Sequence, residues 1–107
     1  MTYKRKMMST LFVLVVSYLT YRIYRLEIYM WFCDQEQNQG ACTVAGLLWK
    51  DQNHIVNSSK YLEKACQLDY PQGCYHLSLL YQDNAKEIEA KQALLKACKL
   101  GYKDACL

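Results

Sequence analysis

Six cysteines at regular intervals are the residues with the most specific chemistry in this chain. Paired thiols at such a spacing can form disulfides, bind a metal ion or stay free. Zinc sites favour closely spaced Cys-x-x-Cys motifs or paired histidines, and this sequence has neither. Six cysteines allow fifteen pairings, but three similar intervals single out three local disulfides. The predicted pairs are Cys33 with Cys42, Cys66 with Cys74, and Cys98 with Cys106.

Each predicted disulfide must join two consecutive helices. Cys66 is expected in the last turn of one helix and Cys74 in the first turn of the next, with a tight turn between them. Antiparallel helices joined in this way can bring two Cα atoms within the roughly 4.4–6.8 Å that a disulfide requires. Loops this small contribute about 2–3 kcal/mol each in the loop-entropy model, which is useful to a domain with a small core.

An internal repeat places these helices along the chain. The sequence KACQLDYPQGC at residues 64–74 returns 32 residues later as KACKLGYKDAC at residues 96–106. When residues 42–74 are aligned with residues 74–106, eleven of the thirty-three positions are identical. A period of this length is typical of helical repeat arrays. The predicted fold class is therefore all-α, with an N-terminal membrane helix followed by a short α/α solenoid of about two disulfide-stapled repeats.

Apolar residues at helical spacing predict the individual helices. They are expected at residues 42–50, 58–67 and 85–99. Asn84 followed by Glu87 resembles a capping box, which would start the last of these helices.

The two histidines, His54 and His76, are isolated in the sequence. His54 is expected in a turn between helices, and His76 on the exposed side of its helix. A metal site needs several ligands that converge, so no metal and no other cofactor is expected.

A basic segment precedes an apolar run at the N-terminus. Lys4, Arg5 and Lys6 come before residues 7–21, which carry no charge. This order is typical of an export signal. No Ala-x-Ala-like pair of small residues follows the run, so we expect an uncleaved signal anchor. A buried core helix and an export signal that is removed are the alternatives.

The anchor divides the chain into three parts. Residues 1–6 are expected to form a cytoplasmic tail, residues 7–24 the membrane anchor, and residues 25–107 the repeat domain. Basic residues before the span favour a cytoplasmic N-terminus, and structural disulfides belong in an oxidising compartment. The expected location is the inner membrane, single-pass, with the repeat domain in the periplasm. The mitochondrial intermembrane space is the alternative. An aromatic belt at one membrane interface is expected from Tyr18, Tyr21, Tyr24 and Tyr29.

Charge excludes one class of partner. From Asp34 onward the chain has eight lysines against nine acidic residues, which gives a net charge of −1. The formal net charge of +3 therefore comes from the N-terminal part of the chain. Because the remaining part has no basic stripe, binding of nucleic acid is not expected.

Residues 41–106 resemble the Sel-one-like repeat, a relative of the tetratricopeptide repeat, and in particular the Helicobacter cysteine-rich protein family. In that family a helix ending in Lys-Ala-Cys is followed by Gly-Cys at the start of the next helix, as at residues 64–66 and 73–74 here. Ser78 stands where the family prefers glycine, and the family's Gly-x-Gly-Val turn is missing. The resemblance implies an α/α solenoid that binds proteins.

The expected function is that of a membrane-anchored periplasmic protein that binds a protein partner, as an adaptor or assembly factor, without catalysis. No catalytic constellation stands out in the sequence. Tyr61 and Tyr81 are expected to pack between repeats. A second copy of the chain, bound through the C-terminal end of the array, is an alternative partner. The partner-binding candidates are Tyr70, Tyr75, Tyr102 and Leu95.

Two other functions fit the same architecture. One is an immunity protein that neutralises a periplasm-acting toxin, so that the partner is a toxin rather than a subunit of an envelope complex. The other is a weak beta-lactamase or penicillin-binding activity, which the family resemblance implies. The Ser-x-x-Lys motif of such enzymes does not occur in this sequence.

Overall fold

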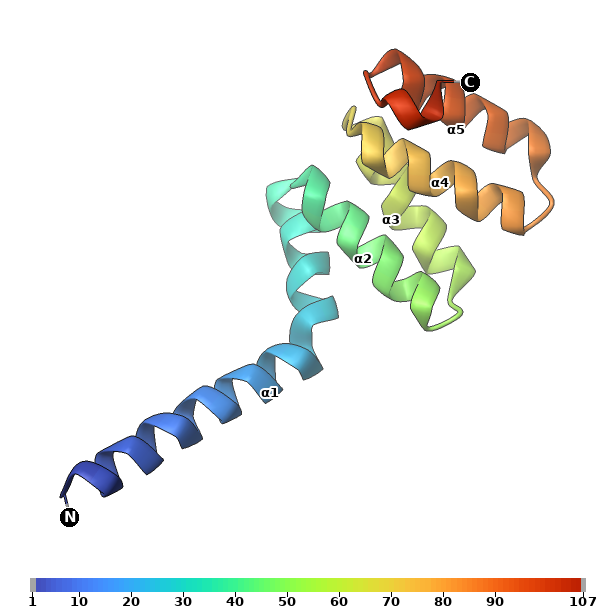
Figure 1. The fold of residues 1–107 in the computed structure, drawn as a ribbon. Coiled ribbons are helices and arrows are strands. Elements are labelled where there is room, and N and C mark those ends of the chain that lie inside the picture. Colours follow the sequence, from blue (N-terminus) through green and yellow to red (C-terminus); the bar gives the residue numbers. More distant parts are fainter. Residues whose placement is uncertain (1, 107) are drawn as a thin grey trace.

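The computed structural model describes residues 2–106 and shows an all-helical molecule. A long apolar helix is followed by four shorter helices that pack in pairs, α2 on α3 and α4 on α5 (Figure 1). Helix α3 also packs on α4, which joins the two pairs. The predicted all-α fold class is confirmed. The elements are α1 (Thr2–Glu36), α2 (Gln39–Asp51), α3 (Ile55–Gln67), α4 (Pro71–Asp83), α5 (Glu87–Lys99) and the short 3-10 helix η1 (Lys103–Ala105).

The backbone repeats with the period of the sequence. Helices α2 and α4 begin and end 32 residues apart, and so do α3 and α5. The turns repeat as well, because residues with positive φ recur at the same interval. Gln37, Asp69 and Gly101 have φ of 49°, 62° and 101° after α1, α3 and α5, and Asn53 and Ala85 have φ of 61° and 59° after α2 and α4. Left-handed residues at equivalent places give both pairs of helices the same connections.

The predicted helix starts need correction. Helices α2 and α3 each begin three residues earlier than expected, and α5 begins two residues later. The capping box is wrong, because Asn84 lies at the end of α4 and its amide donates to the carbonyl oxygen of Leu80 at 2.8 Å. Asparagine suits either end of a helix, and here the positive φ of Ala85 separates it from α5.

Small residues let neighbouring helices approach closely. A Cβ atom at Gly46 would lie 2.6 Å from Cγ of Leu62, so α2 and α3 meet where no side chain separates them. At the same level the hydroxyl of Ser58 donates to the carbonyl oxygen of Gly46 at 2.7 Å. A Cβ atom at Gly73 would lie 2.6 Å from Cβ of Ala65, which brings α4 against α3 in the same manner.

Two apolar clusters form the core. The first gathers residues of α3, α4, α5 and η1 around the fully buried Leu62 and Leu80. The second joins α1 to α2 and α3 around the disulfide of Cys33 and Cys42, together with the buried Tyr61. The two clusters form one stack of helices, because α3 contributes side chains to each.

Helix α1 has two different halves. Its first half carries exposed apolar side chains, and by length and composition the helix is suited to cross a membrane. Its second half packs on the second cluster through Leu26, Tyr29 and Met30. The apolar helix therefore continues into the helical domain and packs there against α2 and α3. The boundaries of the tail and anchor stay predictions.

Candidate partner-binding surface

The three predicted disulfides are confirmed. Their Cα atoms lie 4.6 Å apart at Cys33–Cys42, 4.5 Å at Cys66–Cys74 and 4.9 Å at Cys98–Cys106. Each one connects the last turn of one helix to the segment that follows the turn. In the part of the chain that the structure describes, no group of three or more His, Cys, Asp or Glu side chains could hold a metal ion.

The disulfides fix the positions of successive helices relative to one another. Cys33, Cys42 and Cys74 are fully buried, so two of the three bonds lie inside the helix stack. They lock α1 to α2 and α3 to α4, which are the connections between successive helix pairs. Disulfides at these positions, together with an apolar N-terminal helix, indicate a secreted or envelope protein.

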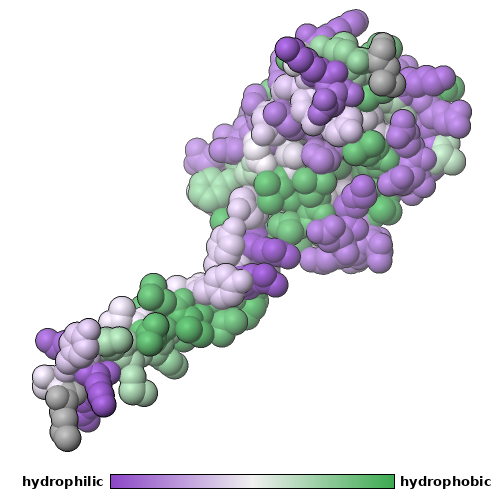
Figure 2. Space-filling view, viewed as in Figure 1, coloured by the Kyte–Doolittle hydropathy of each residue, from purple (hydrophilic) through white to green (hydrophobic). Residues whose placement is uncertain are grey.

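Helices α2 and α4 present an apolar surface that the core does not use. Figure 2 shows apolar side chains over the region of the helical domain where Figure 1 places these two helices. Val44 and Leu47 of α2 and His76 and Leu79 of α4 are half-buried and belong to neither cluster. Val44 corresponds to His76, and Leu47 to Leu79, across the 32-residue period. We call these four residues the A-helix face.

The charges beside the A-helix face are paired. The ammonium group of Lys50 in α2 lies 3.6 Å from the carboxylate of Asp83 in α4, which ties the two helices together. Burial, and next the positive charge of Lys50, lower the pKa of His76 below its ordinary value of 6.5. His76 is therefore neutral at pH 7, and the A-helix face is uncharged. This result corrects the expectation that His76 lies on the exposed side of its helix, because α2 shields it.

Two of the four predicted partner-binding residues lie together. The rings of Tyr75 and Tyr102 have centroids 4.8 Å apart, and the ring of Tyr75 also meets that of His76 at 5.8 Å in an edge-on arrangement. Both tyrosines are half-buried and pack against the first core cluster. The tyrosine pair thus extends the A-helix face toward η1.

The other two predicted residues lie elsewhere. Tyr70 is half-buried at the start of α4 and packs on the second core cluster. Leu95 is 62% exposed on α5. One period earlier its place is taken by Glu63, which accepts a hydrogen bond from the hydroxyl of Tyr81. The structure therefore does not bring all four into one patch, and their role in binding stays a prediction.

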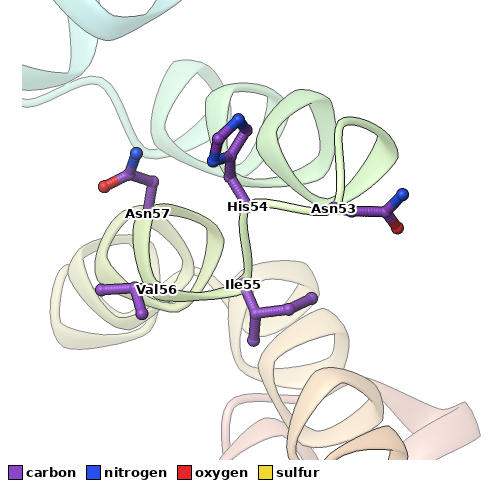
Figure 3. A pocket seen from close by; sticks show the side chains of 5 residues that line it. All are labelled: Asn53, His54, Ile55, Val56 and Asn57. Atoms are coloured by element: carbon purple, nitrogen blue, oxygen red, sulfur yellow. The ribbon is translucent and has the colours of Figure 1, made fainter.

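One turn is hollowed at the surface. Figure 3 shows its lining, which consists of residues 53–57, in the turn after α2 and the first turn of α3. His54 lies in this turn, as expected, and its ring meets Trp49 of α2 edge-on with centroids 5.1 Å apart. The side chains diverge, with His54 and Ile55 pointing in opposite directions. A small-molecule site needs polar groups that converge, and this hollow lacks them.

Comparison of the chain with protein-family models, with characterised proteins and with solved structures finds no match. The evidence for the A-helix face therefore comes from the geometry of the structure alone. Sequence reasoning missed it, although the identity of Leu47 and Leu79 across the period was visible. That signal could not be separated from core packing, because the neighbouring pair Leu48 and Leu80 is repeated just as well and Leu80 is buried.

Proposed function

We propose that this chain is a membrane-anchored helical-repeat protein that binds a protein partner through the A-helix face. The observation that carries the proposal is the half-buried, uncharged surface of Val44, Leu47, His76 and Leu79, which the two core clusters leave out. Leucine is repeated at positions 47 and 79, although neither residue belongs to a core cluster. An apolar contact outside the core, with a partner protein, would explain this repetition.

The rigidity of the support favours binding over catalysis. Disulfides at Cys33–Cys42 and Cys66–Cys74 hold the helix pairs that carry α2 and α4, and Lys50 links these helices through Asp83. A preorganised surface loses little conformational entropy when a partner binds. Such a scaffold suits an adaptor or assembly factor.

The repeat identity belongs to the same proposal. Two 13-residue helices in each unit, a 32-residue period and a disulfide from each second helix to the next unit support membership of the Sel-one-like repeats. The Helicobacter cysteine-rich protein family is the branch that these disulfides favour. The proposed location is the inner membrane, with residues 7–24 as the anchor and the repeat domain in the periplasm.

The test removes the apolar surface without touching the core. The variant carries Leu47→Ser and Leu79→Ser, and the full chain is purified from detergent-solubilised membranes, with bound proteins identified by mass spectrometry. Burial of a leucine side chain contributes about 1.5–3 kcal/mol, so the double variant should weaken binding by more than about tenfold. Val56→Ser is the matched control, because Val56 is 82% exposed and lies outside the face.

Two results would overturn the proposal. One is recovery of the same partners at the same yield with the double variant. The other is equal loss with the Val56→Ser control, which would point to a general effect on folding. A toxin among the recovered partners would make the function immunity, and a subunit of an envelope complex would make it assembly.

A further inference from the structure

The outer side of the second half of α1 is apolar and uncovered. Leu26, Tyr29 and Met30 turn one side of this segment toward the core. Tyr24, Ile28 and Trp31 recur at spacings of four and three residues on the opposite side, which places them on one stripe. All three are exposed, and so is Phe32 beside them. We call these four residues the outer α1 stripe.

The stripe has a composition that is typical of a membrane interface. It holds three aromatic rings and one aliphatic side chain, and Trp31 and Phe32 meet edge-on with centroids 5.1 Å apart. Tryptophan and tyrosine are enriched at the level of the lipid headgroups, where an apolar ring and a polar group are both accommodated. Arg25 lies three residues before Ile28 and seven before Phe32, so it stands beside the stripe, and its long side chain can reach anionic headgroups.

The shape of α1 brings this stripe toward the membrane. Helix α1 bends near its middle, so that the cyan half turns away from the line of the blue half (Figure 1). The repeat domain packs on one side of the cyan half, and the opposite side looks toward the space beside the blue half. The hydroxyls of Tyr21 and Tyr29 lie 2.8 Å apart and link the two halves. A bilayer that surrounds the blue half would therefore meet the outer stripe.

We propose that the second half of α1 lies on the bilayer surface, with Tyr24, Ile28, Trp31 and Phe32 inserted at the headgroup level. This inference rests on the proposed membrane anchor. In this position the outer α1 stripe is buried at the boundary between headgroups and acyl chains, as is the apolar side of other helices that lie in the interface. The other side of the same helix carries the repeat domain, so the orientation of that domain relative to the membrane becomes fixed.

The two tryptophans of the chain provide a probe and a control. Trp49→Phe leaves Trp31 on the outer stripe as the single tryptophan, and Trp31→Phe leaves Trp49, which faces the core side of α1 and donates to the sulfur of Met30 at 3.3 Å. Each full-length variant is reconstituted into phosphatidylcholine vesicles that contain lipids brominated near the top of the acyl chains. The emission of Trp31 is expected to shift to the blue and to be quenched by bromine, while that of Trp49 changes little.

A second variant keeps the test independent of the tryptophan itself. Ile28→Ser with Phe32→Ser, made in the Trp49→Phe background, should restore a red-shifted emission of Trp31 and abolish its quenching by brominated lipid. Mass mapping of the three disulfides verifies that each variant is folded. If brominated lipid does not quench the emission of Trp31, the inference is overturned. This holds whether water or a second copy of the chain covers the stripe.

Flotation of the vesicles at alkaline pH separates this inference from the proposal on which it rests. If the chain floats with the lipid but Trp31 is not quenched, the membrane anchor is supported and the surface placement of the second half of α1 is rejected. A chain that does not float loses the anchor, and the inference falls with it.

Discussion

Gly73 of α4 lies against Ala65 of α3 so closely that a Cβ atom at Gly73 would be 2.6 Å from Cβ of Ala65. The contact sits beside Cys66 and Cys74, whose disulfide fixes the same crossing. The hydroxyl oxygen of Thr43 would lie 3.2 Å from that Cβ atom, so α2 closes the site from a second direction. One missing side chain therefore sets the distance between the two helix pairs.

Gly73→Ala is expected to destabilise the protein by about 1–3 kcal/mol, because the added methyl group forces apart a tightly packed crossing. Gly40→Ala is the control: a Cβ atom there meets nothing closer than 3.4 Å. Alanine is the better helix former, so this change should leave stability equal or raise it by up to about 1 kcal/mol. Urea unfolding of the detergent-solubilised chain, followed by circular dichroism, measures both variants. Equal stability of the two would show that α4 shifts without cost.

The sequence predicts the disulfides well because their pairing is local. Each pair spans one turn, and the repeat supplies the same turn more than once, so Cys66–Cys74 and Cys98–Cys106 support each other. The end of α4 was harder, because Asn84 can start a helix or finish one. The choice depends on the left-handed backbone of Ala85, a residue type that gives no signal for it.

The surface was harder to predict than the fold, because a helical pattern does not show which helix covers which side. His76 falls outside the core positions of α4, so it was expected in solvent. It is shielded because α2 of the preceding pair lies beside it and brings Lys50 close. The sequence also does not show which helices pack beside Leu79 and Leu80. It therefore could not distinguish Leu79, which is half-buried, from Leu80, which is 1% exposed.

The three disulfides should be reduced in a definite order. Thiol–disulfide exchange requires access to a sulfur atom. Cys106 is exposed, whereas Cys33, Cys42 and Cys74 are fully buried. We expect Cys98–Cys106 to open first in a titration with dithiothreitol, as read by alkylation and mass spectrometry.

Loss of that disulfide has a defined cost. Replacing Cys98 and Cys106 by serine should lower the free energy of unfolding by about 2–3 kcal/mol, since the loop-entropy model gives this value for a closed loop of this size. Simultaneous opening of all three disulfides would contradict the expected order, because it would mean that the helix stack unfolds as a unit before any sulfur is attacked.

His76 should make the folded protein sensitive to mild acid. Burial and Lys50 lower the pKa of His76 in the folded state, while the unfolded chain keeps the ordinary value of 6.5. Below about pH 6.5 the unfolded state therefore binds more protons than the folded state, and the free energy of unfolding falls as the pH falls toward the lower pKa. The loss amounts to about 1.4 kcal/mol for each unit by which the pKa is lowered.

The measurement that isolates this effect is urea unfolding between pH 7.5 and 5, in wild type and in the His76→Asn variant. Asparagine does not titrate, so the variant should lose less stability than wild type across this range. His54→Asn is the matched control, because His54 lies exposed in the turn before α3. If His54→Asn flattens the pH dependence as much as His76→Asn does, the shielding of His76 by α2 is not its source. A pH dependence that His76→Asn reduces and His54→Asn does not would show that His76 stays shielded by α2 in solution and that its side chain on the A-helix face is uncharged at pH 7.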